Sequence, residues 1–214
     1  MTRKIWNAIL CGLAVICYSS SSALAADAGA SSADVQSLLS IGKDDRILGD
    51  PNAPITIIEY ASMTCPHCAH FADDVLPELK KKWIDAGKVK LVLRDFPLDG
   101  EAVKASMIAR CAPPDRFYAF IDTFFADQDK WVTAPDYQKA LTRLAALGGM
   151  SKTEVDKCLA DNKLEDRILN SRLVASKNLD VNATPTFFIN GSKFAGDPTV
   201  EAFDKVLSGL ASKS

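Results

Sequence analysis

The stretch IIEYASMTCPHCAHF, residues 57–71, joins an apolar strand pattern to a helical pattern through two cysteines. The β-branched run Ile55–Tyr60 predicts a buried strand. Beyond it, apolar side chains recur every four residues, which predicts an amphipathic helix with Pro77 as a kink inside it. These apolar positions are Phe71, Val75, Leu79 and Trp83. Cys65 and Cys68 therefore fall where a strand ends and a helix begins.

This position has chemical consequences for the two thiols. Residues three apart on a helix face the same way, so Cys65 and Cys68 can form a disulfide. Unpaired N–H groups and the helix dipole favour an anion at the helix N-terminus, which lowers the pKa of Cys65. Cys68 aligns with the apolar stripe. We therefore expect an exposed, activated Cys65, which forms a mixed disulfide, and a shielded Cys68, which resolves it.

The two residues between the cysteines favour the same chemistry. Pro66 suits a first helical turn because no N–H is needed there. His67 can add a hydrogen-bond donor or a positive charge beside the thiolate. Both effects stabilise the reduced form, and a more stable reduced form makes the disulfide a stronger oxidant. The motif is therefore interpreted as a donor of disulfides.

Other uses of the motif fit less well. Attachment of haem requires C-x-x-C-H, but Ala69 follows the second cysteine. A zinc site would need four ligands from six residues of one helix start, whereas structural zinc usually draws on two separate segments. Those four residues are Cys65, His67, Cys68 and His70. Two inert structural thiols are the remaining alternative. We favour the redox interpretation and predict no metal site.

The N-terminus predicts export. Arg3 and Lys4 precede the apolar run Ile5–Tyr18, and Ala23-Leu24-Ala25 resembles a cleavage site, so residues 1–26 are interpreted as a signal peptide. The run is too short to span a bilayer, although an uncleaved anchor is the alternative. Cleavage would leave four of the six cysteines, and an even number in an exported chain suggests disulfide chemistry.

The rest of the chain divides by pattern. Residues 27–52 are expected to form an arm with one short helix, and Val89–Arg94 a second strand parallel to the first. Residues 99–179 carry only helical signals, followed by a strand and turn (184–191), a short returning strand, and a helix from Pro198 to Leu210. The helices expected in the middle segment are Glu101–Cys111, Arg116–Phe125, Ala134–Leu147, Lys152–Ala160 and Leu164–Leu179.

The sequence resembles the DsbA-like branch of the thioredoxin superfamily. The resemblance rests on residues 57–71 and on ATPTFFING, residues 183–191, and it extends over about residues 45–212. It implies an α/β protein with a thioredoxin-like fold and an inserted helical domain. The core would comprise residues 53–98 and 183–214, and the inserted domain residues 99–182.

The resemblance also implies roles for individual residues. Cys65 matches the attacking thiol, Cys68 its buried partner, and Pro66 and His67 the dipeptide of the oxidases. Pro185 matches the cis-proline loop, which together with Thr184 would offer backbone groups to an extended substrate. Glu59 matches an acidic residue buried beneath the active site and could exchange a proton with Cys68. An exposed carboxylate at the strand end is the alternative for Glu59.

A second cysteine pair lies in the expected helical domain. Some members of the family carry a disulfide there, and we favour a structural bridge between Cys111 and Cys158. Two buried free thiols are the alternative. A second catalytic centre is not expected, because neither cysteine has a neighbouring partner in sequence.

Together these features predict a periplasmic enzyme, a monomeric thiol:disulfide oxidoreductase that oxidises reduced exported polypeptides. It would use no cofactor beyond its own Cys65–Cys68 disulfide, and a membrane DsbB-type partner would reoxidise it. The net charge of −2 gives no reason to expect nucleic-acid binding. Thr184 also occurs in disulfide isomerases, so an isomerase or reductase remains open. A metal-binding dithiol and a dedicated thiol partner of one client protein are further alternatives.

Overall fold

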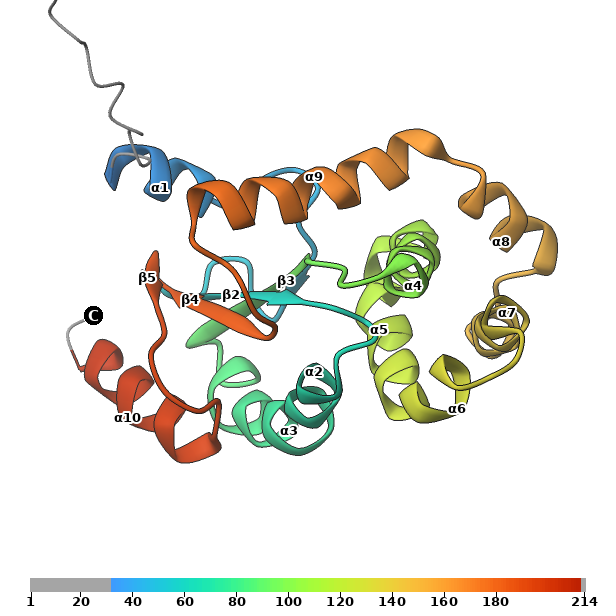
Figure 1. Ribbon diagram of the computed structural model, residues 1–214. Coiled ribbons are helices and arrows are strands. Elements are labelled where there is room, and N and C mark those ends of the chain that lie inside the picture. The colour runs from blue at the N-terminus through green and yellow to red at the C-terminus, as the bar shows by residue number, and fades with distance from the viewer. Residues whose placement is uncertain (1–31, 213–214) are drawn as a thin grey trace, which may run out of the picture.

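The computed structural model describes residues 32–212 of the 214-residue chain (Figure 1). The predicted signal peptide, residues 1–26, lies outside the described residues. The strands are β1 (Ile47–Leu48), β2 (Ile55–Ala61), β3 (Val89–Asp95), β4 (Thr186–Ile189) and β5 (Ser192–Lys193). The α-helices are α1 (Ser32–Leu38), α2 (Pro66–His70), α3 (Leu76–Leu79), α4 (Gly100–Cys111), α5 (Phe117–Ala126), α6 (Gln128–Val132), α7 (Tyr137–Leu147), α8 (Lys152–Leu159), α9 (Asn162–Asn178) and α10 (Val200–Ala211). Within these residues no helix has the length and apolarity needed to cross a bilayer.

The strands form one sheet in the order β1-β3-β2-β4-β5. β2 pairs in parallel with β3 along its whole length, as the strand-helix-strand pattern predicts. It pairs antiparallel with β4, so that Tyr60 lies opposite Thr186. The last residues of β2 and the first residues of β4 therefore lie at the same end of the sheet. This register brings the segment after β2, which carries Cys65, next to the segment before β4, which carries Pro185.

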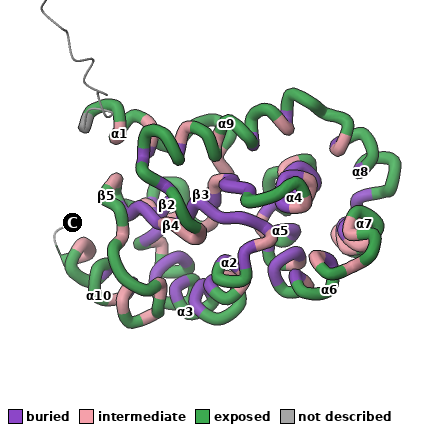
Figure 2. Tube along the Cα trace, viewed as in Figure 1, coloured by how far each residue is buried: buried purple, intermediate pink, exposed green. Residues whose placement is uncertain are grey.

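Both faces of the sheet are covered by helices (Figure 1). On one face, strand residues such as Ile57 and Phe187 pack against Phe71 of the helical segment after α2 and Phe203 of α10. On the other, Ile58 and its neighbours pack against residues of α1 and α9. Figure 2 shows the resulting buried trace through β2 and β3. Because strand side chains alternate between faces, a strand buried on both sides reads as the continuous apolar run found in the sequence.

The helices between β3 and β4 form a unit that we call the helical module, α4–α9 (Gly100–Asn178). Its apolar core includes residues of α4, α5, α6 and α7, and the same cluster contains Cys65 and Cys68. Tyr118 of α5 also ties the module to the sheet. Its hydroxyl accepts from the N–H of Leu93 at 3.1 Å and lies 2.9 Å from the carbonyl oxygen of Leu91. The module therefore contacts both β3 of the sheet and the cysteine motif.

The segment before β2 is more ordered than an arm with one short helix. β1, which was not predicted, pairs antiparallel with β3. Arg94 of β3 holds the segment with a bidentate ion pair to Asp45, at 3.0 and 2.8 Å, and donates to the carbonyl oxygens of Leu38 and Ser40. A strand of two residues has too short an apolar pattern to be recognised in a sequence.

The helix after the cysteine motif differs from the expected kinked α-helix. Its backbone alternates between α2, a π-helical turn at Phe71–Val75, α3, and a second π-helical turn at Lys80–Ile84. In an α-helix, the Pro77 ring would clash with the carbonyl group four residues earlier. The π-helical turn that ends just before α3 widens the backbone at this point, so the chain continues as a helix.

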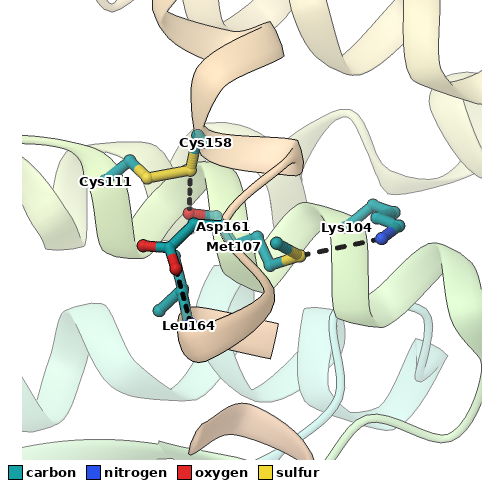
Figure 3. The surroundings of a disulfide bond; sticks show 6 residues. All are labelled: Lys104, Met107, Cys111, Cys158, Asp161 and Leu164. Carbon is teal, nitrogen blue, oxygen red and sulfur yellow. Dashed lines mark hydrogen bonds between the residues drawn. A yellow bond between two sulfur atoms is a disulfide. The ribbon is translucent and has the colours of Figure 1, made fainter. Parts of the chain in front are cut away.

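A disulfide joins Cys111, the last residue of α4, to Cys158 of α8, with a Cα–Cα distance of 6.1 Å. Cys158 is buried, whereas Cys111 is exposed. Figure 3 shows the bond beside Met107, whose carbonyl oxygen lies 2.9 Å from the Cys158 sulfur. Met107 and Cys158 belong to a small apolar cluster with Leu164 and Ile168. The disulfide therefore links α4 to α8 at the edge of a packed interface.

Removal of this disulfide should destabilise the protein. The two cysteines are separated by 47 positions, and a crosslink closing a loop of this size stabilises the folded state by about 4 kcal/mol through loss of chain entropy. We expect the double substitution Cys111→Ala/Cys158→Ala to lower the free energy of unfolding in urea by about this amount. An unchanged urea midpoint at equal slope would contradict a structural role for the bond.

Candidate active site

The cysteine motif occupies the corner between β2 and α2. Cys65 is the N-cap of α2, with φ −82° and ψ 119°, and Pro66 is the first helical residue. The carbonyl oxygen of Cys65 accepts the N–H groups of Cys68 at 3.1 Å and Ala69 at 3.2 Å, which starts the helix. Pro66 itself has no N–H, so the first helical position has no donor to satisfy. The sulfur of Cys65 therefore lies at the positive end of the helix, as its sequence position predicts.

The burial of the two thiols differs in part from the expectation. Cys68 is fully buried, as expected, but Cys65 is also buried and only 5% exposed, so the prediction of an exposed Cys65 is wrong. The sulfur of Cys65 is 3.2 Å from the carbonyl oxygen of Thr184, and both cysteines pack in the core cluster of the helical module. The position of Cys65 at a helix start did not reveal that segments distant in sequence cover it.

The surroundings of Cys65 strongly favour its thiolate. The thiol of Cys68 donates a hydrogen bond to the Cys65 sulfur, and this is the largest cause that lowers the pKa of Cys65 to about 5. The hydroxyl of Thr184 and the backbone N–H groups of Cys68 and His67 lower this pKa further, against the opposing effect of burial. Cys65 is therefore a thiolate at neutral pH although it is buried.

Cys68 has the opposite environment. Burial is the largest cause that raises the pKa of Cys68, and the hydrogen bond to Cys65 and the charges of Glu59 and Cys65 raise it further. Cys68 therefore remains protonated while Cys65 is ionised. The motif thus holds one negative charge and one proton, which is the asymmetry that dithiol exchange requires.

The Thr184–Pro185 peptide bond is cis, and this turn faces the cysteines across the sheet edge. The hydroxyl oxygen of Thr184 is buried and has no hydrogen-bond partner among the described residues. This hydroxyl is available to the Cys65 thiolate, and its hydrogen bond lowers the pKa of Cys65. Thr184 and Pro185 thus lie beside the reactive sulfur, although they are separated from it by more than half of the chain.

Glu59 lies inside the protein beneath the motif. It is 2% exposed, and its Oε1 atom has no hydrogen-bond partner among the described residues. The alternative of an exposed carboxylate at the strand end is therefore wrong. Burial, and secondly the charge of Cys65, raises the pKa of Glu59 to about 8. Glu59 is consequently a neutral acid at pH 7. The charge of Cys65 acts on Glu59, and the charge of Glu59 in turn raises the pKa of Cys68.

The two histidines of the motif point away from this buried cluster. His67 is exposed and contributes its backbone N–H to the environment of Cys65. His70 is exposed and pairs with Asp74 at 2.7 Å. Within residues 32–212, no three His, Cys, Asp or Glu side chains are grouped so that they could hold a metal ion.

Two residues at the site were not recognised in the sequence. Asp99, the N-cap of α4, accepts from the hydroxyl of Thr64 at 2.7 Å. Gln128, the first residue of α6, donates to the carbonyl oxygens of Met63 and Cys65. Asp99 immediately precedes the helical module and Gln128 belongs to it, and neither residue is part of a motif or an apolar pattern. Only the tertiary structure brings them to the active site.

The geometry agrees with comparisons to known proteins. The family model described as "Thioredoxin" matches residues 42–208. The chain belongs to the thioredoxin family. The match spans the sheet, the cysteine motif and the helical module, so the predicted thioredoxin-like fold with inserted helices is confirmed.

The structure of the chain is similar to solved structures of DsbA proteins. The crystal structure of α-DsbA1 from Wolbachia pipientis is 35% identical, with a TM-score of 0.78 over 84% of this chain and 96% of that one. A Novosphingobium aromaticivorans structure described as a protein-disulfide isomerase is 25% identical, with a TM-score of 0.70 over 79% of this chain and 99% of that one. The predicted resemblance to DsbA-like proteins is thereby confirmed.

Curated relatives point the same way. A Rickettsia bellii protein named "Putative protein-disulfide oxidoreductase" is 37% identical over 71% of this chain. The chain spans 59% of that protein and at most 65% of the four further Rickettsia relatives that it matches.

The ionisation of Cys65 can be measured directly. In the fully reduced protein, the ultraviolet absorbance of the thiolate should rise with a midpoint near pH 5. Replacement Cys65→Ser should abolish this transition, because Cys68 stays protonated in the same range. A midpoint above neutrality in the wild-type protein would contradict the environment described for Cys65.

The buried acid should leave a signature in the pH dependence of stability. The pKa of Glu59 rises from 4.5 to about 8 on folding, so its contribution to stability is lost as the pH rises through that window. Glutamine carries no charge at any pH. We therefore expect Glu59→Gln to make the protein with reduced Cys65 and Cys68 more stable than wild type at pH 8, and this advantage to vanish at pH 4.5. Urea unfolding at both pH values measures it, and equal differences at the two would refute a buried, proton-holding Glu59.

Proposed function

We propose that the protein is a thiol:disulfide oxidoreductase that oxidises substrate dithiols through its Cys65–Cys68 disulfide. The observation that carries the proposal is the pairing of a stabilised Cys65 thiolate with a buried, protonated Cys68. Whatever stabilises the reduced pair raises the reduction potential of the disulfide. Since the hydrogen bonds that stabilise the thiolate exist only after reduction, they favour transfer of the disulfide to a substrate.

The reaction would proceed in two exchanges. A substrate thiolate attacks the sulfur of Cys65, the Cys65–Cys68 bond breaks, and Cys68 departs with the electron pair and takes a proton. Glu59 is a neutral acid at pH 7 and is proposed as the source of that proton. The second substrate thiolate then attacks the substrate sulfur of the mixed disulfide and displaces Cys65. The substrate loses two electrons to form its disulfide, and the protein gains them as a dithiol.

The low pKa of Cys65 assists the second exchange, because thiols of low pKa are good leaving groups. Thr184 and Pro185 are proposed to bind the substrate backbone, since their turn lies against the Cys65 sulfur. Because Cys65 is buried, a substrate must reach it at this turn. Cys65 would therefore react with a segment that can extend along the turn rather than with a folded surface.

A second direction of catalysis also has support. A related structure is described as a protein-disulfide isomerase, and Thr184 matches the residue that the sequence resemblance associates with isomerases. In an isomerase, the Cys65 thiolate would attack incorrect disulfides of its substrate. A thiol partner for a single client and a metal-binding dithiol are weaker candidates, because no described residue at the site supports either of them.

The cellular setting belongs to the same proposal. Export to the periplasm is supported by the N-terminal sequence pattern, and reoxidation by a membrane DsbB-type partner by the resemblance to DsbA proteins. Reduced exported polypeptides would be the substrates, and the protein would act as a monomer.

One parallel assay separates the directions of catalysis. Reduced and scrambled forms of a protein with several disulfides are incubated with catalytic amounts of the enzyme in a buffer of oxidised and reduced glutathione, which reoxidises the enzyme, and their native fractions are followed. We expect rapid oxidation of the reduced form and little reshuffling of the scrambled form. Cys65→Ser should be inactive. With the scrambled substrate, Cys68→Ser should accumulate a mixed disulfide, because its Cys65 thiolate can attack a substrate disulfide but has no Cys68 to release it. Efficient reshuffling, or a reduction potential near the value of about −270 mV of thioredoxin, would sink the oxidase proposal.

A further inference from the structure

A buried side-chain amide of the helical module binds the backbone of the cysteine motif. Gln128 is 5% exposed, and its Nε2 atom donates to the carbonyl oxygen of Met63 at 2.8 Å and to that of Cys65 at 3.1 Å. A side-chain amide has two N–H groups. Both are therefore used, one on each side of Thr64.

The two carbonyl groups lie where the sheet no longer provides partners. β2 pairs with β3 as far as Ala61, so the Met63 carbonyl lies beyond the ladder. The Cys65 carbonyl begins α2 and already accepts the N–H groups of Cys68 and Ala69. Buried carbonyl groups need donors, and Gln128 supplies one to each from outside the strand and the helix.

Gln128 is itself held in place by the corner between α5 and α6. The indole of Trp131 donates to the carbonyl oxygen of Phe124 at 2.8 Å, and Trp131 is 1% exposed. The backbone N–H groups of Lys130 and Trp131 both donate to the carbonyl oxygen of Asp127, which precedes Gln128. The backbone that carries Gln128 is therefore fixed by a packed turn, and its amide is not on a mobile surface segment.

We propose that Gln128 is a positioning residue for Cys65, which holds the Met63–Cys65 backbone so that the donors of α2 and the Cys68 thiol converge on the Cys65 sulfur. It also binds the negative ends of two carbonyl dipoles close to the thiolate. Both effects favour the ionised form of Cys65. This inference rests on the proposed role of Cys65 as the reactive thiolate, and it assigns to the helical module a part in tuning that thiolate.

The test replaces the amide with a side chain of the same length that has no donor. Gln128→Met should raise the thiolate midpoint of Cys65 by about one pH unit, equivalent to about a tenfold change in the ionisation equilibrium. Equilibration with glutathione should then show a disulfide that is less oxidising by a similar factor. Gln138→Met, the same change at an exposed position of α7, is the matched control and should have the wild-type midpoint.

A second variant guards against misfolding of the first. Gln128→Glu keeps the shape of the side chain, but its carboxylate would face two carbonyl oxygens without a donor, so the midpoint should rise at least as far. Circular dichroism verifies that each variant is folded. In the wild-type protein, the side-chain amide protons of Gln128 should shift in NMR spectra with the same midpoint as Cys65, and Cys65→Ser should remove this shift.

The outcomes separate this inference from the proposed function. Wild-type midpoints in folded variants, or amide protons of Gln128 that do not respond to the titration, would overturn the role of Gln128. The proposed function is tested separately, by the pH at which the Cys65 thiolate forms in the wild-type protein. A higher thiolate midpoint in Gln128→Met supports the positioning role of Gln128, whether the enzyme acts as an oxidase or as an isomerase.

Discussion

The negative charge of the Cys65 thiolate is stabilised by neutral hydrogen-bond donors and not by a cation. The Cys68 thiol, the Thr184 hydroxyl and the N–H groups at the start of α2 all converge on one sulfur atom. The donors come from two parts of the fold: α2, which follows β2, and the turn before β4, which contains Thr184. The sheet register therefore matters chemically, because it brings these donors within reach of a single atom.

Burial makes this arrangement both necessary and effective. A charge inside a protein is costly unless it is hydrogen-bonded, and the same exclusion of water strengthens every hydrogen bond that it receives. Glu59 shares the site, and its pKa is raised, first by burial and second by the charge of Cys65, which disfavours another anion beside it. The pair therefore carries one negative charge between about pH 5 and about pH 8. The proton on Glu59 remains available at the pH where the thiolate is needed.

The sequence was sufficient for features that depend on local pattern. Ile55–Tyr60 and the four-residue repeat after Phe71 predict the strand and the helix, and the strand-helix-strand order predicts their parallel pairing. The position of Cys65 at the start of α2 follows from these alone. The π-helical turns around Pro77 were not predicted, because apolar spacing does not distinguish them from α-helical turns.

Features that depend on distant contacts could not be obtained in this way. The burial of Cys65 results from the Thr184 turn and the helical module, neither of which is adjacent in sequence. Pro185 was assigned through the family resemblance, since a proline in a sequence does not reveal a cis bond or a neighbour. Gln128 lies in a five-residue helix without a clear pattern. The role of one isolated polar residue cannot be predicted from the sequence, because it depends on hydrogen-bond partners that only the fold brings near.

The apolar cluster that surrounds Cys65 and Cys68 has an implication for the modularity of the protein. This cluster is formed mainly by side chains of the helical module, together with Met63 and Leu93 of the sheet region. A chain shortened to its strands and flanking helices would retain the Cys-Pro-His-Cys motif but lose the walls around its sulfur atoms. Water would then enter and weaken the hydrogen bonds on the thiolate. The inserted helices are therefore part of the surroundings of the two sulfur atoms, and not only an appendage to the sheet.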